Sequence, residues 1–188
     1  SASIDALILE GYDAILIDAS SSTALNPVCQ RALDAGIVVV AFDQIVTAEG
    51  VVKYGCPFGD TAEEAAKYLV AALGGEGNIV VDRGLAGASG SIPLYDRAMA
   101  VFDQYPDIHV VAEFDSNYAE GDTLAGMQAA IAANPVIDGV YTQSYAAPVI
   151  QALNEAERPM VPVVSWSYNS SFEAMAENDC DGCVIHNG

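Results

Sequence analysis

The sequence predicts an α/β fold, in which parallel sheets are covered by helices. Short apolar runs typical of strands alternate with segments whose apolar residues recur at helical spacing. The links between them are short, and this alternation is the signature of parallel strands joined by crossover helices. The strand-like runs are almost entirely apolar, as expected of strands that are buried on both faces.

The first elements follow directly from this pattern. The run AILIDA predicts a strand over residues 14–19, and IVVVAF predicts a strand over residues 37–42 that is buried on both faces. Between them lies a helical pattern over residues 23–36, which continues past Pro27 with small and apolar residues on one face and is ended by Gly36.

The segment 60–75 is the clearest helix of the sequence. Asp60 or Thr61 can cap its first turn, acidic residues follow, and Gly74–Gly75 end it. The rest of the chain continues the alternation. Further strands are expected over residues 78–82, 108–114, 137–144, 161–167 and 183–187, and further helices over residues 93–106, 120–135, 146–157 and 170–178.

The charge of the chain excludes several classes of partner. Its 188 residues include 6 Lys and Arg against 26 Asp and Glu, a formal net charge of −20. A basic surface for nucleic acid is absent, and anionic membranes and polyanionic ligands are disfavoured. No stretch approaches the ~18 apolar residues of a membrane span, so we expect no membrane insertion of this chain.

Polar and aromatic residues follow almost every predicted strand. In parallel sheets, ligands bind beyond the carboxyl ends of the strands. Amides, hydroxyls, a carboxylate and aromatic faces suit a neutral polyol. The residues concerned are 18–20, 43–44, 82–83, 115–118, 143–145, 166–168 and 186–187.

Known catalytic and cofactor motifs are absent. The segment GASGS (residues 87–91) lacks the spacing of a nucleophile elbow, and GGEGN (residues 74–78) follows a helix rather than opening one. His109 and His186 lie far apart in the sequence, and we interpret His109 as structural. We therefore expect no enzyme activity and no cofactor.

The segment CDGCVIH offers Cys180, Cys183 and His186 as three zinc ligands, but no fourth ligand is evident. The two cysteines precede a strand, whereas redox C-x-x-C pairs begin a helix. We therefore expect no metal, and either a disulfide in a tight loop or two free thiols. With Cys29 and Cys56, the four cysteines allow three full pairings.

Residues 4–44 (IDALILEGYDAILIDASSSTALNPVCQRALDAGIVVVAFDQ) resemble the type I periplasmic sugar-binding proteins of ABC importers, the group similar to ribose-binding protein. Residues 65–81, 102–114, 127–144 and 161–167 also look like family segments. The resemblance implies two Rossmann-like lobes, a partial N-terminal lobe at 1–56 and a C-terminal lobe at 57–188, with a hinge near residues 56–57. It also implies that lobe-one segments are missing at both ends of the chain.

The resemblance further implies a set of ligand contacts. Asp43 matches a carboxylate that binds sugar hydroxyls, and Tyr118 matches an aromatic that stacks on the sugar. Several family residues are replaced: Gln44 and Ile92 stand where ribose binders have arginines. The predicted ligand-binding residues are Asp43, Gln44, Tyr118, Gln143, Ser144, Trp166, Ser167 and His186.

The function implied is capture of a sugar or polyol in an inter-lobe cleft by a monomer, which presents it to an ABC transporter permease. The expected location is periplasmic or otherwise extracytoplasmic, with a lipid anchor as one option for the full-length protein. The alternative is the effector-binding core of a LacI-type regulator, which shares this fold. An α/β enzyme is a third hypothesis, which no nucleophile–base pair supports.

Overall fold

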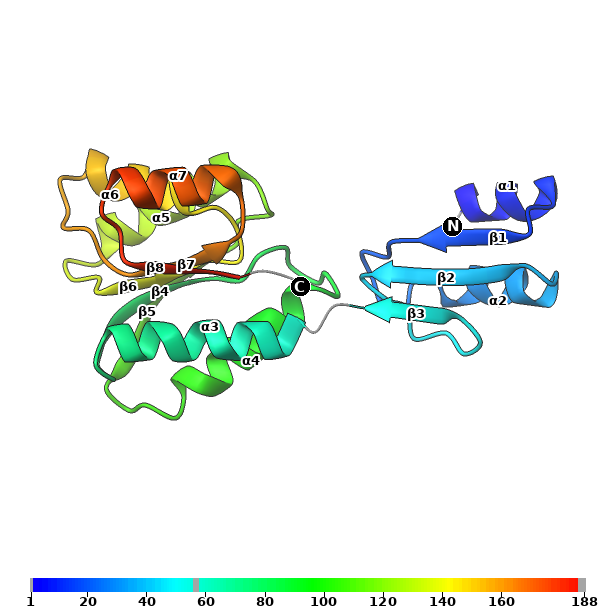
Figure 1. Cartoon of the computed structure of the whole chain (residues 1–188), viewed down its shortest axis with the longest axis horizontal. Coiled ribbons are helices and arrows are strands. Elements are labelled where there is room, and N and C mark those ends of the chain that lie inside the picture. Colours follow the sequence, from blue (N-terminus) through cyan, green and yellow to red (C-terminus); the bar gives the residue numbers. More distant parts are fainter. Residues whose placement is uncertain (1, 56–57, 186–188) are drawn as a thin grey trace. The chain divides into compact units, whose positions relative to one another are not determined.

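The computed structural model describes residues 2–55 and 58–185 and confirms the α/β fold (Figure 1). The described residues form two compact units. The first contains residues 2–55 and 87–90, and the second contains residues 58–86 and 91–185. Each unit is built on its own sheet, in which all the described strands are parallel.

The first unit has a three-stranded sheet in the order β1-β2-β3. Its strand β3 was not among the expected strands. All four of its residues are exposed, so pairing with β2, in which Val40 lies opposite Val52, defines this strand rather than burial. The elements of the unit are α1 (Ala2–Glu10), β1 (Ala14–Ile17), α2 (Asn26–Asp34), β2 (Val38–Asp43) and β3 (Val52–Gly55).

Strand β2 is buried on one face only, so the expected burial on both faces is wrong. Val39 and Ala41 are buried among residues of α1 and α2, whereas Val38 is 51% exposed and Phe42 is 41% exposed. Both helices of the unit pack on the same side of the sheet, and within the described residues the other side is open to solvent. Because apolar residues occupy both faces, the sequence pattern alone could not reveal this difference.

The second unit has a five-stranded sheet in the order β5-β4-β6-β7-β8. Its strands confirm the expected elements, although β6 and β7 are shorter than the predicted runs. The elements are α3 (Phe58–Ala72), β4 (Gly77–Asp82), α4 (Ser91–Phe102), β5 (Ile108–Phe114), α5 (Glu120–Ala133), β6 (Gly139–Tyr141), α6 (Ala146–Glu155), β7 (Val163–Trp166), α7 (Asn169–Glu177) and β8 (Gly182–Ile185).

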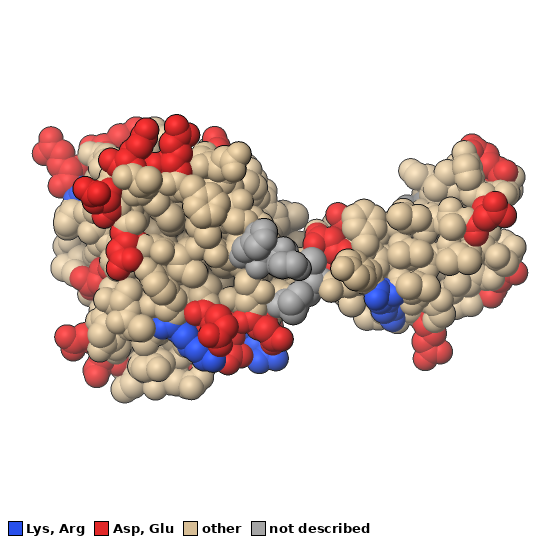
Figure 2. Space-filling view, in the orientation of Figure 1, with Lys and Arg blue, Asp and Glu red and all other residues tan. Residues whose placement is uncertain are grey.

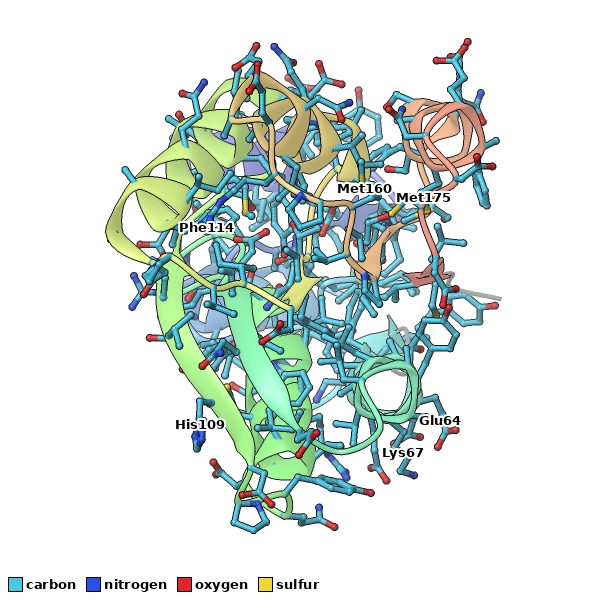
Figure 3. The ribbon with its side chains drawn as sticks, turned by 90° about the vertical axis from the view of Figure 1, so that its left-hand side faces the viewer. Glu64, Lys67, His109, Phe114, Met160 and Met175 are labelled. Atoms are coloured by element: carbon cyan, nitrogen blue, oxygen red, sulfur yellow. The ribbon has the colours of Figure 1, made fainter. Side chains whose placement is uncertain are left out.

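Helices cover both faces of this second sheet, which makes three layers (Figure 1). Ile79 and Val81 of β4 pack with α3 and α4, while Val80 between them packs with α5 and α6. This is the alternation that a strand buried on both faces requires. Phe114 lies against α5 (Figure 3), where a side chain at Gly126 would come within 2.4 Å of its ring.

Helix α3 begins at Phe58, so the expected cap at Asp60 or Thr61 is wrong, and Asp60 lies in the first turn instead. There its carboxylate still suits the positive end of the helix dipole. The predicted end is confirmed, because Gly74 and Gly75 both have positive φ and the amide of Gly75 donates to the carbonyl of Val70. The charged face of α3 points outward, where Glu64 and Lys67 form an ion pair (Figure 3).

Candidate functional site

The carboxyl ends of the strands in the second unit meet at one edge of the sheet. The register places Asp82 of β4 opposite Phe114 of β5, and Trp166 of β7 opposite Ile185 of β8. The loops that leave β4, β5, β6 and β7 therefore start side by side. This edge, with the first residues of those loops, is called the carboxyl edge below.

Asp82 holds three of these loops together. It is fully buried, and its Oδ1 accepts hydrogen bonds from the amides of Gly84 at 2.7 Å and Ser116 at 3.0 Å. Its Oδ2 accepts from the Thr142 hydroxyl at 2.8 Å and the Gln143 amide at 3.1 Å. Each of these partners is a donor, so the arrangement fits an ionised carboxylate. Burial nevertheless raises the pKa of Asp82 above its ordinary value, and the hydrogen bonds partly oppose that shift.

Gln143 and Ser144, both predicted ligand contacts, lie beneath the carboxyl edge and are fully buried. The Gln143 side chain donates to the carbonyl of Ser91 at 3.3 Å, and its Oε1 has no hydrogen-bond partner among the described residues. A side chain at Gly84, where φ is +73°, would come within 2.6 Å of that Oε1. Only glycine fits there, because both the backbone conformation and the space exclude a Cβ.

Tyr118 is held in a strained turn that follows β5. Asn117 and Tyr118 have φ of 50° and 55°, and the amide of Ala119 donates to the carbonyl of Ser116. Positive φ at both central positions is typical of a type I′ turn, which usually contains Asn or Gly and rarely a bulky residue. The Tyr118 hydroxyl hydrogen-bonds the Ser91 hydroxyl at 2.5 Å, so the half-buried ring is held at the edge.

The strained backbone gathers at strand ends. Among the described residues, the non-glycine residues with positive φ include Asp43, which ends β2, and Asn117 and Tyr118, which lie in the turn after β5. The two others, Glu157 and Asp179, follow helices, where this conformation is common. Left-handed backbone costs roughly 1–2 kcal/mol per residue and is often found at functional sites. This distribution supports a functional role for the strand ends.

Asp43 and Gln44, the predicted contacts of the first unit, lie together at the carboxyl end of β2. Both are half-buried, and Asp43 has a φ of 56°. The Gln44 Oε1 accepts a hydrogen bond from the Ser89 hydroxyl at 3.2 Å, and the same hydroxyl lies 3.0 Å from the carbonyl of Ala19. The loop residues 87–90 thus fix the Gln44 side chain within this unit.

Trp166 ends β7 at the carboxyl edge and Ser167 follows it, and both are half-buried. The Trp166 ring lies 6.3 Å from the ring of Phe58, and the Ser167 amide donates to the carbonyl of Ile185 at 3.1 Å. The structure therefore brings the predicted contacts of the second unit to one edge. His186 lies outside the described residues.

The sequence interpretation missed three features of this edge. These are the role of Asp82 as the common acceptor, the Ser91 hydroxyl that meets Tyr118, and a stacked pair formed by Tyr145 and Tyr168. The two tyrosines come directly before helices, where Ser, Thr, Asp or Asn would be expected as caps. A tyrosine at a helix N-cap position is unusual and visible in the sequence, so it was a local signal that could have identified Tyr145 and Tyr168.

Each of the 6 Lys and Arg side chains, all of which lie among the described residues, contacts a carboxylate or a backbone carbonyl. Of the 6 Lys and Arg, only Arg83 follows a strand at the carboxyl edge, and it makes a two-pronged ion pair with Asp115 at 2.9 Å. Acidic side chains are scattered over both units and basic ones are few (Figure 2). The other partners are Asp5 for Arg31, the Thr47 carbonyl for Lys53, Glu63 and Glu64 for Lys67, Glu63 for Arg97, and the Asn134 and Pro135 carbonyls for Arg158.

The cysteine-rich segment forms no disulfide among the described residues. Cys180 and Cys183 are free and half-buried, and burial raises the pKa of both thiols. Within residues 2–55 and 58–185, no three His, Cys, Asp or Glu side chains gather closely enough to hold a metal. His109 lies near the start of β5, exposed and away from the carboxyl edge (Figure 3).

None of the described helices has the length and apolar character that crossing a bilayer requires.

Comparison with known proteins identifies relatives along the whole chain. A xylitol-binding protein of Mycolicibacterium smegmatis is 31% identical over 191 residues, which cover 98% of this chain and 54% of that protein. A D-ribose/D-allose-binding protein of Pseudomonas aeruginosa is 43% identical over 60 residues, which cover 29% of this chain and 18% of that protein. The chain thus spans about half the length of the first of these relatives.

One solved structure is similar to this chain over nearly its whole length. The ABC transporter solute-binding protein of Thermobispora bispora superposes with a TM-score of 0.89 at 29% identity, covering 96% of this chain and 56% of that one. A family model described as "Periplasmic binding protein domain" matches residues 1–187. The resemblance inferred from the sequence and the fold it implies are confirmed. The chain belongs to the periplasmic binding protein domain family.

Proposed function

We propose that this protein binds a neutral sugar or polyol and delivers it to an ABC transporter. The observation that supports a neutral solute is the state of the 6 Lys and Arg side chains. Four of them form ion pairs with carboxylates, including Arg83 at the carboxyl edge with Asp115, and the other two contact backbone carbonyls. An anionic solute would have to break such a pair or lie unpaired among acidic residues, which is unfavourable. Hydroxyls and aromatic rings at the same edge suit neutral hydroxyl-bearing molecules.

The proposed solute contacts are the residues that the resemblance implies. Tyr118, Trp166 and Ser167 are half-buried at the carboxyl edge of the second sheet. Asp43 and Gln44 lie at the carboxyl end of β2 in the first sheet. Gln143 and Ser144 lie beneath the edge, where they support it. His186 completes the proposed set from outside the described residues. Ile92, which stands where ribose binders have an arginine, is 49% exposed, so that position offers an apolar surface.

The relatives favour transport over regulation or catalysis. The xylitol-binding protein and the solute-binding protein named above are binding proteins, so we propose a binding role rather than an enzyme or a LacI-type effector core. The same relationship supports an extracytoplasmic location and a membrane permease as the protein partner. A lipid anchor on the full-length protein belongs to the same proposal.

A thermal-shift comparison of matched solutes tests the neutral-solute proposal. We expect xylitol, D-ribose or D-allose to raise the melting temperature, because a ligand that binds only the folded state stabilises it by an amount that grows with the ratio of ligand concentration to dissociation constant. D-Ribonate and D-allonate, which carry a carboxylate on the same carbon chains, serve as controls and should give no shift. A larger shift with the acids than with the neutral solutes would refute the proposal.

A further inference from the structure

Tyr145 and Tyr168 form a stacked aromatic pair at the carboxyl edge. Their ring centroids lie 3.9 Å apart and their planes differ by 20°. Both side chains are only half-buried, although each already covers one face of the other. The pair therefore leaves aromatic surface open at the edge where parallel sheets bind their ligands.

Both tyrosines occupy positions that helices normally use for capping. Tyr145 is the N-cap of α6 and Tyr168 is the N-cap of α7, and neither side chain makes a capping hydrogen bond. The fully buried hydroxyl of Ser171 takes over at α6, where it accepts a hydrogen bond from the amide of Ala146 at 3.0 Å. A polar cap in place of a non-capping residue stabilises a helix by about 1 kcal/mol, so these rings are not explained by helix stability.

The stack also fixes the two rings against each other, and Tyr168 is uncharged. The pKa of Tyr168 is raised to about 12. Burial is the largest cause, and the neighbouring Tyr145 and then Tyr118 add to the same shift. Tyr168 is therefore a neutral phenol at physiological pH. Because each ring holds the other in place, binding against the pair costs little side-chain entropy.

We propose that Tyr145 and Tyr168 act together as an aromatic wall that packs against the C–H face of the bound solute and determines which solutes are accepted. The assignment rests on the proposed function, because it presumes a neutral sugar or polyol. A centroid separation of 3.9 Å leaves no room between the rings, so the solute packs on an outer face of the pair. The rival explanation is that the stack only joins α6 to α7.

Substitutions that remove the ring but keep apolar volume test the wall. Tyr145→Leu and Tyr168→Leu should each weaken binding of the tightest of xylitol, D-ribose and D-allose by about tenfold or more, measured by calorimetry. Tyr145→Phe and Tyr168→Phe keep the ring and should stay within a few fold of the parent. Tyr105→Leu removes a tyrosine from the opposite end of the sheet, between α4 and β5, and should leave the affinity unchanged.

The outcomes separate the wall from the function on which it rests. If the parent chain binds a solute and both Leu variants bind it equally well, the wall is refuted and the proposed function stands. Weakened binding by the Phe variants, which retain the packing, would also refute it, because the hydroxyls would then be the contacts. If the parent binds none of the three solutes, both proposals fail. A role limited to joining α6 and α7 would lower the melting temperature of the Leu variants while the affinity per folded molecule stays the same.

Discussion

Replacing Asp82 by asparagine tests whether this buried carboxylate holds the carboxyl edge together. In the more favourable orientation of its side-chain amide, the asparagine oxygen still accepts hydrogen bonds from the amides of Gly84 and Ser116. Its NH₂ group then faces the donors of Thr142 and Gln143. The Thr142 hydroxyl can rotate and accept from this group, but the Gln143 amide cannot. One buried donor then has no acceptor, which costs about 1–3 kcal/mol of unfolding free energy.

Chemical denaturation followed by fluorescence measures this loss, because the single tryptophan, Trp166, lies in the same unit. Asp115→Asn is the matched control. It removes a carboxylate from the same edge, but the pair with Arg83 is partly exposed and should contribute less than about 1 kcal/mol. If Asp82→Asn loses no more unfolding free energy than Asp115→Asn, the four hydrogen bonds of Asp82 do not stabilise the edge.

The pH dependence gives an independent check on Asp82. Its pKa is higher in the folded protein than in the unfolded chain. The stability that this group contributes is therefore fully present below the unfolded pKa of about 3.9 and is lost as the pH rises through the folded pKa. The stability difference between the parent and Asp82→Asn should be greater near about pH 4 than at neutral pH. A difference that grows with rising pH would contradict this direction.

Three further predictions concern the backbone and the proposed contacts. Gly84→Ala should lower the unfolding free energy by more than Gly74→Ala. Both glycines have positive φ, but only at Gly84 would a new Cβ lie close to other atoms. Equal losses of unfolding free energy in denaturation would disprove the steric contribution at Gly84. Tyr118→Gly should be about 1 kcal/mol more stable than Tyr118→Ala, because glycine relieves its left-handed backbone, and both should bind xylitol or D-ribose more weakly by calorimetry. Asp43→Asn should weaken binding by about 1.5–3 kcal/mol with little change in stability, since asparagine also tolerates positive φ; intact affinity with a lowered unfolding midpoint would rule out the ligand role.

The fold could be predicted because its strongest signals are local. Apolar runs of strand length and helical periodicity are both visible within a short window, and glycines such as Gly74 punctuate them. Strand β3 was missed because it is defined by pairing with β2 and none of its residues is buried. The open face of the first sheet was missed because Val38 and Phe42 are as apolar as their buried neighbours.

The candidate site was only partly predictable, because its contacts join distant segments. An acidic residue at the end of a strand is visible in the sequence, but Asp82 meets Ser116 and Thr142, which are 34 and 60 residues further along the chain. The stack of Tyr145 on Tyr168 likewise joins two loops. The family resemblance supplied the proposed contacts, while the hydrogen bonds that hold them come from the folded structure.

The central claim, that the solute is neutral, is tested most directly by the salt dependence of binding. Calorimetric titration of the tightest neutral solute at low and at high ionic strength compares the two affinities in one protein. A neutral solute forms no ion pair that salt can screen, so the account predicts the same dissociation constant at both. A dissociation constant that rises steeply with salt, together with tighter binding of the matching sugar acid, would contradict the account.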